Sequence, residues 1–147
     1  MANPEFQQQE VPTFPCLPPG SNVVAVGIDL ESVSRIQAAI ERHGNTFLRK
    51  VFTPEEETLC QRRGNARWSS FAARWAAKEA FSKALGTGIG SDFAMTDAGV
   101  VNNEFGGPSF TLSLRAQEAL RERGATRALL SITHTRDTAA AIVVFLA

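Results

Sequence analysis

The sequence predicts a single α+β domain with a long central helix and a mostly antiparallel sheet. Its length of 147 residues suits one compact domain. A short β-rich segment comes first and is followed by several helical segments. The last third then alternates short apolar segments with glycine-rich turns, a pattern that is typical of antiparallel strands packed with helices.

The first 21 residues are expected to form an extended, proline-rich arm outside the domain, which then spans residues 22–147. Five of the seven prolines and a run of three glutamines fall in this arm, and they disfavour both helix and interior strand. The arm lacks a basic start followed by an apolar segment, so we do not expect a secretion signal.

The first strand is predicted over residues 23–28, because its residues are mostly β-branched and apolar. Asp29 is expected to end this strand, since aspartate is a poor strand residue. A helix should follow from Ser32 or Ser34 to about His43, where the next glycine ends it.

A short helical stretch over residues 47–52 precedes a clear helix start. Thr53 is suited to cap the helix, and Pro54 suits the first helical position because it has no N–H to satisfy. Three glutamates then follow at the positive end of the helix dipole. This helix is predicted to end near Arg63.

The longest helix is predicted from about Ala66 to Leu85, where Gly86 ends it. Its alanines favour helix and allow close approach of another element. Glu79 and Lys83 lie one turn apart on a stripe that is otherwise small or apolar. The pair is therefore either a functional site within a packing face or an exposed ion pair worth about 0.3–0.5 kcal/mol. Spacing alone leaves both interpretations open.

Four more strands and one more helix complete the prediction. Each lies between glycine, proline or polar turn residues. The strands are predicted over residues 95–101, 109–114, 128–133 and 138–145, and the helix over residues 115–123.

Composition excludes several classes of protein. With 44 % hydrophobic and 20 % charged residues, the chain is not disordered as a whole. No apolar run approaches the roughly 20 residues of a membrane span. A formal net charge of zero argues against a general nucleic-acid binder. Two cysteines make neither a disulfide framework nor a metal knuckle, so a reducing cytoplasm is expected.

Charge is unevenly distributed along the chain. Residues 31–83 carry ten Lys or Arg against six Asp or Glu, whereas residues 84–147 carry five against six. The middle segment is therefore a candidate face for an anionic partner, and the alternative is an ordinary solvated helical surface.

Cations and carboxylates of the long helix suggest a phosphate site. Arg74 and Lys78 lie one turn apart on a face next to Glu79, and with Lys83 they would suit a polyphosphate bound with a divalent metal. Asp29 is a second carboxylate, and Mg²⁺ is typically held by one or two carboxylates plus substrate phosphates. A helix-capping role for this aspartate is the alternative.

Two further segments contain candidate binding residues. Glycines in GTGIG at 86–90 let backbone N–H groups approach an anion, although a helix C-cap also explains the first of them. The segment lacks the Gly-Lys-Ser/Thr of a Walker loop. His134, in SITHT, is suited to hydrogen-bond a phosphate or shuttle a proton, and a turn histidine satisfied by the backbone is the alternative.

Taken together and in this order, these segments resemble the bacterial holo-acyl-carrier-protein synthase family, the short-chain 4′-phosphopantetheinyl transferases. The resemblance covers about residues 23–146, and its most specific part is WAAKEAFSKALGTGIG, where Trp75 stands in place of an expected Phe. The segments are GIDL at 27–30, Arg35, FTPEE at 52–56, RWAAKEAFSKALGTGIG at 74–90, FGGP at 105–108 and SITHT at 131–135.

The resemblance implies a 4′-phosphopantetheinyl transferase fold and a Mg²⁺-dependent enzyme of fatty acid and lipid biosynthesis. Members transfer phosphopantetheine from coenzyme A to a serine of apo acyl carrier protein and release adenosine 3′,5′-bisphosphate. It also implies a cytoplasmic homotrimer with active sites between subunits, and neither a membrane nor a nucleic acid as partner. A non-catalytic coenzyme A or nucleotide-binding module and a metal-dependent phosphodiesterase are the alternatives.

Site residues also follow from the resemblance. It assigns the metal to Asp29 and Glu79 and adds Lys83 to the catalytic set. The proton acceptor for the serine stays open between Glu79, a water at the metal and, less favoured, His134. The residues implied for coenzyme A are Arg74, Lys83, Gly86, Thr87, Gly88, His134 and Thr135, and those implied for carrier-protein docking are Arg35, Arg42 and Lys50.

Overall fold

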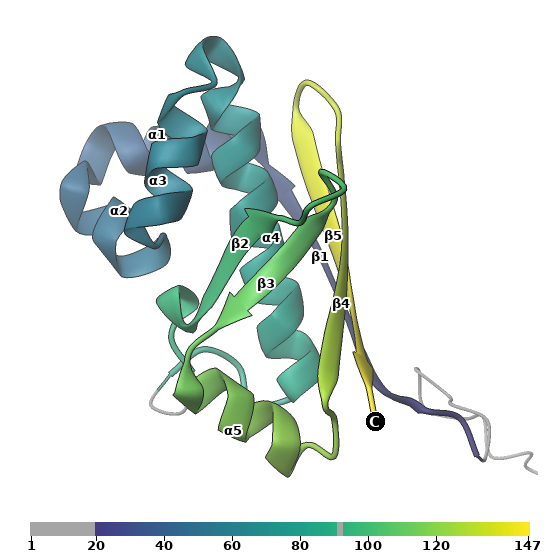
Figure 1. Ribbon diagram of the computed structural model, residues 1–147. Coiled ribbons are helices and arrows are strands. Elements are labelled where there is room, and N and C mark those ends of the chain that lie inside the picture. Colours follow the sequence, from purple (N-terminus) through teal and green to yellow (C-terminus); the bar gives the residue numbers. More distant parts are fainter. Residues whose placement is uncertain (1–19, 91–92) are drawn as a thin grey trace, which may run out of the picture.

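The computed structural model describes residues 20–90 and 93–147, and its helices and strands follow the predicted order. The expectation for the N-terminal arm lies almost wholly outside these residues. A long helix packs against a three-stranded sheet, with three short helices near its first half and one helix at its far end (Figure 1). The helices are α1 (Val33–His43), α2 (Asn45–Val51), α3 (Pro54–Gln61), α4 (Arg67–Leu85) and α5 (Leu114–Glu122).

All strand pairs in the described residues are antiparallel, which confirms the predicted α+β class. The larger sheet has the order β1-β5-β4, and the other two strands form a separate hairpin. The strands are β1 (Val23–Ser32), β2 (Ala98–Asn102), β3 (Pro108–Leu112), β4 (Arg127–His134) and β5 (Thr138–Leu146).

Local sequence signals explain the helix boundaries. Ser32 caps α1 by accepting a hydrogen bond from the Arg35 backbone N–H. Thr53 and Glu56 form a reciprocal capping box at the start of α3, with Pro54 in the first turn. Helix α4 ends at Gly86, which adopts the left-handed conformation that glycine favours.

The predicted end of the first strand was wrong, because β1 continues through Asp29 to Ser32. These extra residues pair with β5, and Asp29 lies opposite Ala141. Pairing with a neighbouring strand outweighs the poor strand propensity of aspartate. Alternation along β1 then puts Asp29 and Glu31 on the face that packs against α4, while Ile28 and Leu30 point away from it.

Helix α4 and strand β1 touch through their backbones at Gly27. A Cβ atom built on this glycine would lie 1.8 Å from the carbonyl oxygen of Ala80, far inside any real contact. Only glycine therefore permits this approach, and it brings β1 directly onto the middle of the helix.

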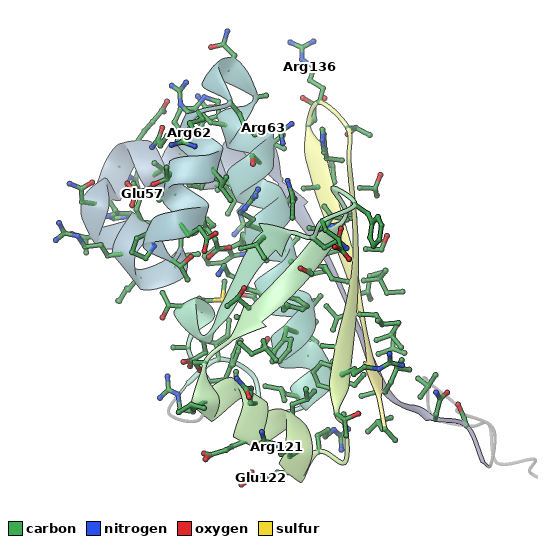
Figure 2. The ribbon with its side chains drawn as sticks, viewed as in Figure 1. Glu57, Arg62, Arg63, Arg121, Glu122 and Arg136 are labelled. Carbon is green, nitrogen blue, oxygen red and sulfur yellow. The ribbon has the colours of Figure 1, made fainter. Side chains whose placement is uncertain are left out.

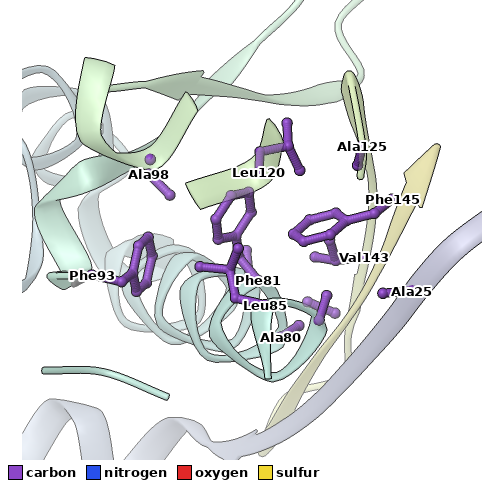
Figure 3. Packing of buried hydrophobic residues seen from close by; sticks show 14 of the residues in the cluster. Ala25, Ala80, Phe81, Leu85, Phe93, Ala98, Leu120, Ala125, Val143 and Phe145 are labelled. Atoms are coloured by element: carbon purple, nitrogen blue, oxygen red, sulfur yellow. The ribbon is translucent and has the colours of Figure 1, made fainter. Parts of the chain in front are cut away.

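The core lies between α4, the sheet and α5, as Figure 3 shows. Phe81 is at its centre, with its ring centroid 5.0 to 5.2 Å from those of Phe93, Phe110 and Phe145. A second buried cluster lies under α1, α2 and α3 and includes Phe52 and Phe71. These two clusters fix the helix against the sheet on one side and against the short helices on the other.

The outer face of the larger sheet is apolar and exposed. Four large side chains from all three strands lie on it and stand at least 40 % open to solvent, namely Ile28, Leu30, Leu129 and Ile142. Exposed apolar groups that share one face mark an interaction surface more often than scattered ones do. Among the described residues, none of the helices is both long and apolar enough to cross a membrane.

Candidate active site

Asp29 of β1 and Glu79 of α4 belong to two elements in contact and lie close enough for their charges to interact. Each is partly buried. Burial raises the pKa of Glu79, and the negative charges of Asp29 and Glu31 raise it further, while Lys83 lowers it. The structure thus brings together two carboxylates that are fifty residues apart in sequence, along with a third that the sequence analysis did not identify.

Glu31 was missed because the first strand was predicted to end at Asp29. A strand has a side-chain period of two, so a residue two positions further along shares the same face. Once β1 continues past Asp29, this rule places Glu31 on the α4 side. Its Oε1 accepts a hydrogen bond from the Ser32 backbone N–H at 3.0 Å.

Lys83 forms hydrogen bonds to strand β1 rather than to Glu79, one turn earlier on α4. Its Nζ donates to Asp29 Oδ1 at 2.8 Å and to the Ile28 carbonyl at 3.1 Å. The simple exposed Glu79–Lys83 pair, considered as an alternative from spacing, is therefore not the interaction that forms. The lysine side chain is 52 % exposed, so it remains accessible to a ligand.

The free oxygen of Asp29 fits a cation. Its Oδ2 is buried and has no hydrogen-bond partner, although a buried carboxylate oxygen is costly unless it is bonded or neutralised. Within the described ranges, no group of three or more His, Cys, Asp or Glu side chains is placed to hold a metal by itself. Two carboxylates completed by phosphate oxygens and water suit Mg²⁺.

Arg74 lines a separate cavity of about 290 Å³ and has no counter-ion there. The side chain belongs to a residue only 7 % exposed. One terminal nitrogen donates to Ser70 Oγ at 2.6 Å, while Nε is buried without a partner. No ion pair to Arg74 forms with any described residue. A buried guanidinium without a carboxylate is a strong candidate to bind an anion.

His134 joins Arg74 in this cavity, together with Arg63 and the turn of FGGP. No aspartate or glutamate lines it. His134 also borders a larger neighbouring cleft of about 580 Å³, which Thr135, Trp68 and Arg136 line as well. Figure 2 shows Arg63 and Arg136 at the same end of the molecule.

The candidate coenzyme A residues therefore divide into two groups. Arg74 and Glu79 are five positions apart on α4, so their side chains leave the helix about 140° apart. Neither cavity beside His134 is lined by Asp29, Glu79 or Lys83. Gly86, Thr87 and Gly88 form an exposed loop just after Lys83, and both glycines have positive φ.

Lys78 was expected to be a phosphate-binding cation, and this expectation was wrong. Its Nζ is fully buried and donates to Glu56 Oε1 at 2.6 Å, to the Met95 carbonyl at 3.0 Å and to the Ala98 carbonyl at 2.8 Å. The second oxygen of Glu56 accepts from the Val100 backbone N–H. All three donors of the lysine are thus used inside the protein.

The three residues assigned to carrier-protein docking lie on α1 and α2, and all are exposed. Arg35 is 80 % open at the side chain, with Glu31 at 3.7 Å. Arg42 lies in the last turn of α1. Lys50 borders an apolar cavity of about 410 Å³ that also contains Trp75 stacked on Phe47.

Comparison with known proteins shows a similarity to one family over most of the chain. The family model of the 4′-phosphopantetheinyl transferase superfamily matches residues 25–143. A holo-[acyl-carrier-protein] synthase of Desulforudis audaxviator is 42 % identical over 122 residues, which cover 83 % of this chain and 92 % of that protein.

Two solved structures are similar over most of the chain. The crystal structure of the holo-[acyl-carrier-protein] synthase from Neisseria meningitidis has a TM-score of 0.78 and 33 % identity, covering 85 % of this chain and 99 % of that one. The Helicobacter pylori synthase in complex with coenzyme A has a TM-score of 0.72 and 33 % identity, covering 82 % and 98 %.

Proposed function

The chain belongs to the 4′-phosphopantetheinyl transferase superfamily, and we therefore propose that it transfers 4′-phosphopantetheine from coenzyme A to a serine of apo acyl carrier protein. The serine oxygen attacks the phosphorus on the pantetheine side of the diphosphate. The bond from this phosphorus to the bridging oxygen breaks, and adenosine 3′,5′-bisphosphate leaves. The observation that carries the proposal is Asp29, with a buried unpartnered oxygen, next to Glu79.

Asp29 and Glu79 would hold Mg²⁺, and the unpartnered oxygen of Asp29 supports this assignment. When bound, the ion supplies positive charge against the diphosphate, whose negative charge grows as the bond breaks. Two protein carboxylates leave room for phosphate oxygens and water among its ligands.

Lys83 and Glu79 have separate tasks in the transfer. The accessible ammonium of Lys83 next to Asp29 is suited to bind a phosphate oxygen of the diphosphate. Glu79 or a water at the metal is the proposed group that takes the proton of the serine hydroxyl. The exposed loop of Gly86, Thr87 and Gly88 follows Lys83 in the chain. The backbone N–H groups of Thr87 and Gly88 are suited to bind a phosphate oxygen, whereas that of Gly86 closes the helix by donating to the Ser82 and Lys83 carbonyls.

Arg74, His134 and Thr135 are proposed to bind another part of coenzyme A. The support is the buried guanidinium without a counter-ion in a cavity free of carboxylates. Because this cavity is not lined by Asp29 or Glu79, one chain by itself presents two incomplete halves of a site. In a site between subunits, one subunit would supply Asp29 and Glu79 and its neighbour would supply the Arg74 cavity.

A homotrimer is the proposed assembly, and the exposed apolar face of the β1-β5-β4 sheet is its proposed interface. Placing aspartate at Ile142, near the centre of that face, should dissociate the assembly, because a charge would be buried there. Sedimentation velocity tests this. The wild type and Leu114→Asp, a control at an exposed leucine of α5, should sediment as three chains. A monomeric wild type, or an unchanged Ile142→Asp, would contradict the proposal.

Arg35→Glu is expected to raise the KM for apo acyl carrier protein about tenfold and leave the KM for coenzyme A nearly unchanged. Carrier proteins present an acidic helix, so reversing an exposed charge on α1 turns attraction into repulsion. Initial rates at low and at high salt measure this, and the effect should shrink at high salt. Arg121→Glu on α5, at the opposite end of the molecule in Figure 2, is the control. A loss of coenzyme A affinity would refute the docking role.

Mass spectrometry tests the function directly. Apo acyl carrier protein incubated with coenzyme A, Mg²⁺ and this protein should gain one covalent phosphopantetheine. Free phosphopantetheine without an adduct would indicate a phosphodiesterase instead. Retained coenzyme A without turnover would indicate a binding module. The carrier partner and the low cysteine content support a cytoplasmic enzyme of fatty acid and lipid biosynthesis.

A further inference from the structure

Glu31 is a third carboxylate on the face of β1 that packs against α4. It lies opposite Ala139 of β5, just as Asp29 lies opposite Ala141, and residues directly opposite each other in a sheet point to the same face. Both alanines are buried, at no more than 2 % exposure. Glu31 is therefore on the inner face beside Asp29, close enough to Glu79 for the two charges to interact.

The Glu31 side chain is anchored through one oxygen and keeps the other free. It is only 12 % exposed. Its Oε1 accepts from the Ser32 backbone N–H at 3.0 Å, and the Arg35 guanidinium lies 3.7 Å from the same atom. Arg35 is 80 % exposed, which makes this ion pair weak. Oε2 has no hydrogen bond to any residue in the described ranges.

The three carboxylates carry more negative charge than nearby cations balance. Lys83 bonds to Oδ1 of Asp29 at 2.8 Å, but Oδ2 of the same residue is buried without a partner. The carboxylate of Glu79 accepts no hydrogen bond from the part of the chain that the structure describes. Such an excess of charge is unfavourable in a partly buried place, and a divalent cation relieves it.

Glu31 lies too far along the strand to share an ion directly with Asp29. Positions i and i+2 of a strand are about 7 Å apart, whereas an oxygen that binds Mg²⁺ lies about 2.1 Å from the ion. Among the described residues, no three side chains of the ligand types are placed to hold one metal. A water on the ion, in contrast, reaches an acceptor about 5 Å from the ion. The spacing therefore suits a hydrogen bond from such a water to the free oxygen of Glu31.

We propose that Glu31 is a third acidic residue of the metal site and accepts a hydrogen bond from a water ligand of the ion. The role rests on the proposed function, which assigns the metal to Asp29 and Glu79. Mg²⁺ usually keeps several of its waters, and a group that orients metal ligands from outside raises the affinity about tenfold or more. Glu31 thus lets the ion bind before coenzyme A adds its phosphate oxygens.

Titration of Mn²⁺ into the metal-free protein, without coenzyme A, tests this role. The electron paramagnetic resonance signal of free Mn²⁺ measures binding. Glu31→Gln keeps an oxygen for the Ser32 N–H but replaces the free oxygen with an NH₂ group, so it should bind Mn²⁺ about tenfold more weakly. Glu41→Gln removes the same charge from an exposed position on α1 and should bind as the wild type does. Unchanged affinity in Glu31→Gln, or an equal loss in Glu41→Gln, would overturn the role.

Thermal unfolding gives a second measurement that a merely structural role would not move. The midpoint of metal-free Glu31→Gln should equal or exceed that of the wild type, because one of three like charges is gone. Saturating Mn²⁺ binds the folded chain and should raise the midpoint of the wild type more than that of the variant at the same concentration. Equal increases in the two proteins would contradict a contact between Glu31 and the bound ion.

These outcomes separate the role of Glu31 from the proposed function, because Mn²⁺ binding requires neither coenzyme A nor a carrier protein. If the wild type modifies the carrier but Glu31→Gln binds Mn²⁺ normally, only the role of Glu31 fails. If Glu31→Gln loses affinity as stated but no carrier is modified, the third carboxylate stands and the transferase proposal fails. A wild type that binds Mn²⁺ only with coenzyme A present would overturn the role of Glu31 whatever the carrier assay gives.

Discussion

Glu79→Gln and Asp29→Asn are each expected to lower kcat for holo-carrier formation by about 10²–10⁴-fold, the usual range for losing a proton acceptor or the charge stabilisation a metal provides. Either change removes one of the two carboxylates proposed to hold Mg²⁺. Steady-state rates over a series of Mg²⁺ concentrations measure the effect. Normal Mg²⁺-dependent rates in both variants would remove the metal assignment.

Thermal unfolding measurements distinguish this loss of activity from a loss of folded protein. Burial and the charges of Asp29 and Glu31 raise the pKa of Glu79, so its ionised form is disfavoured in the folded protein. Removing that charge should leave the thermal midpoint of the metal-free protein unchanged or higher. Glu118→Gln, on the exposed side of α5, is the control for both measurements. A much lower midpoint for Glu79→Gln would mean that its carboxylate supports the fold.

Lys78→Met is expected to cost about 3–5 kcal/mol of unfolding free energy, the range for breaking a buried ion pair by removing one partner. Burial lowers the pKa of this lysine, while Glu56 opposes that shift. Without the ammonium, the Glu56 carboxylate keeps only backbone donors, and the carbonyls of Met95 and Ala98 lose a bond. The variant thus leaves one buried carboxylate without a counter-ion and removes a hydrogen bond from two carbonyls.

Urea unfolding of Lys78→Met, Glu56→Gln and the double variant measures the coupling. The double variant should lose less than the sum of the two single losses, because the second change removes the unpaired charge that the first one leaves. Arg121→Met, at an exposed cation of α5, should change stability by less than about 0.5 kcal/mol. A loss below 1 kcal/mol for Lys78→Met would mean that the ammonium reaches water in solution.

The order of the elements could be predicted because local signals agree with the fold. Thr53, Pro54 and the following glutamates mark a helix start in any context, and Gly44 and Gly86 mark helix ends in the same way. The end of β1 could not be predicted, since it depends on β5, more than a hundred residues later. That single error also hid Glu31.

Residue type alone did not predict that Lys78 is buried whereas Lys83 is exposed. Both lie on the same helix five residues apart, and each is charged. Lys78 is buried because Glu56 and two carbonyls converge on it, and those partners come from α3, from the segment before β2 and from the first residue of β2. The resemblance assigned Lys83 to the reaction. The sequence did not predict that Arg74 lines a cavity that Glu79 does not line, because this depends on which elements pack against each side of α4.

The close backbone approach at Gly27 sets the spacing between the two elements that carry Asp29 and Glu79, and repacking of side chains does not change this spacing. The distance between β1 and α4 is fixed by backbone atoms in contact. The two elements therefore cannot move closer together, and a side chain at position 27 would not fit between them. Substitutions that adapt this protein to another partner should therefore be tolerated at exposed positions, such as the cations of α1, and not at Gly27. The contact between β1 and α4 thus keeps the two carboxylates in place while exposed residues around it can change.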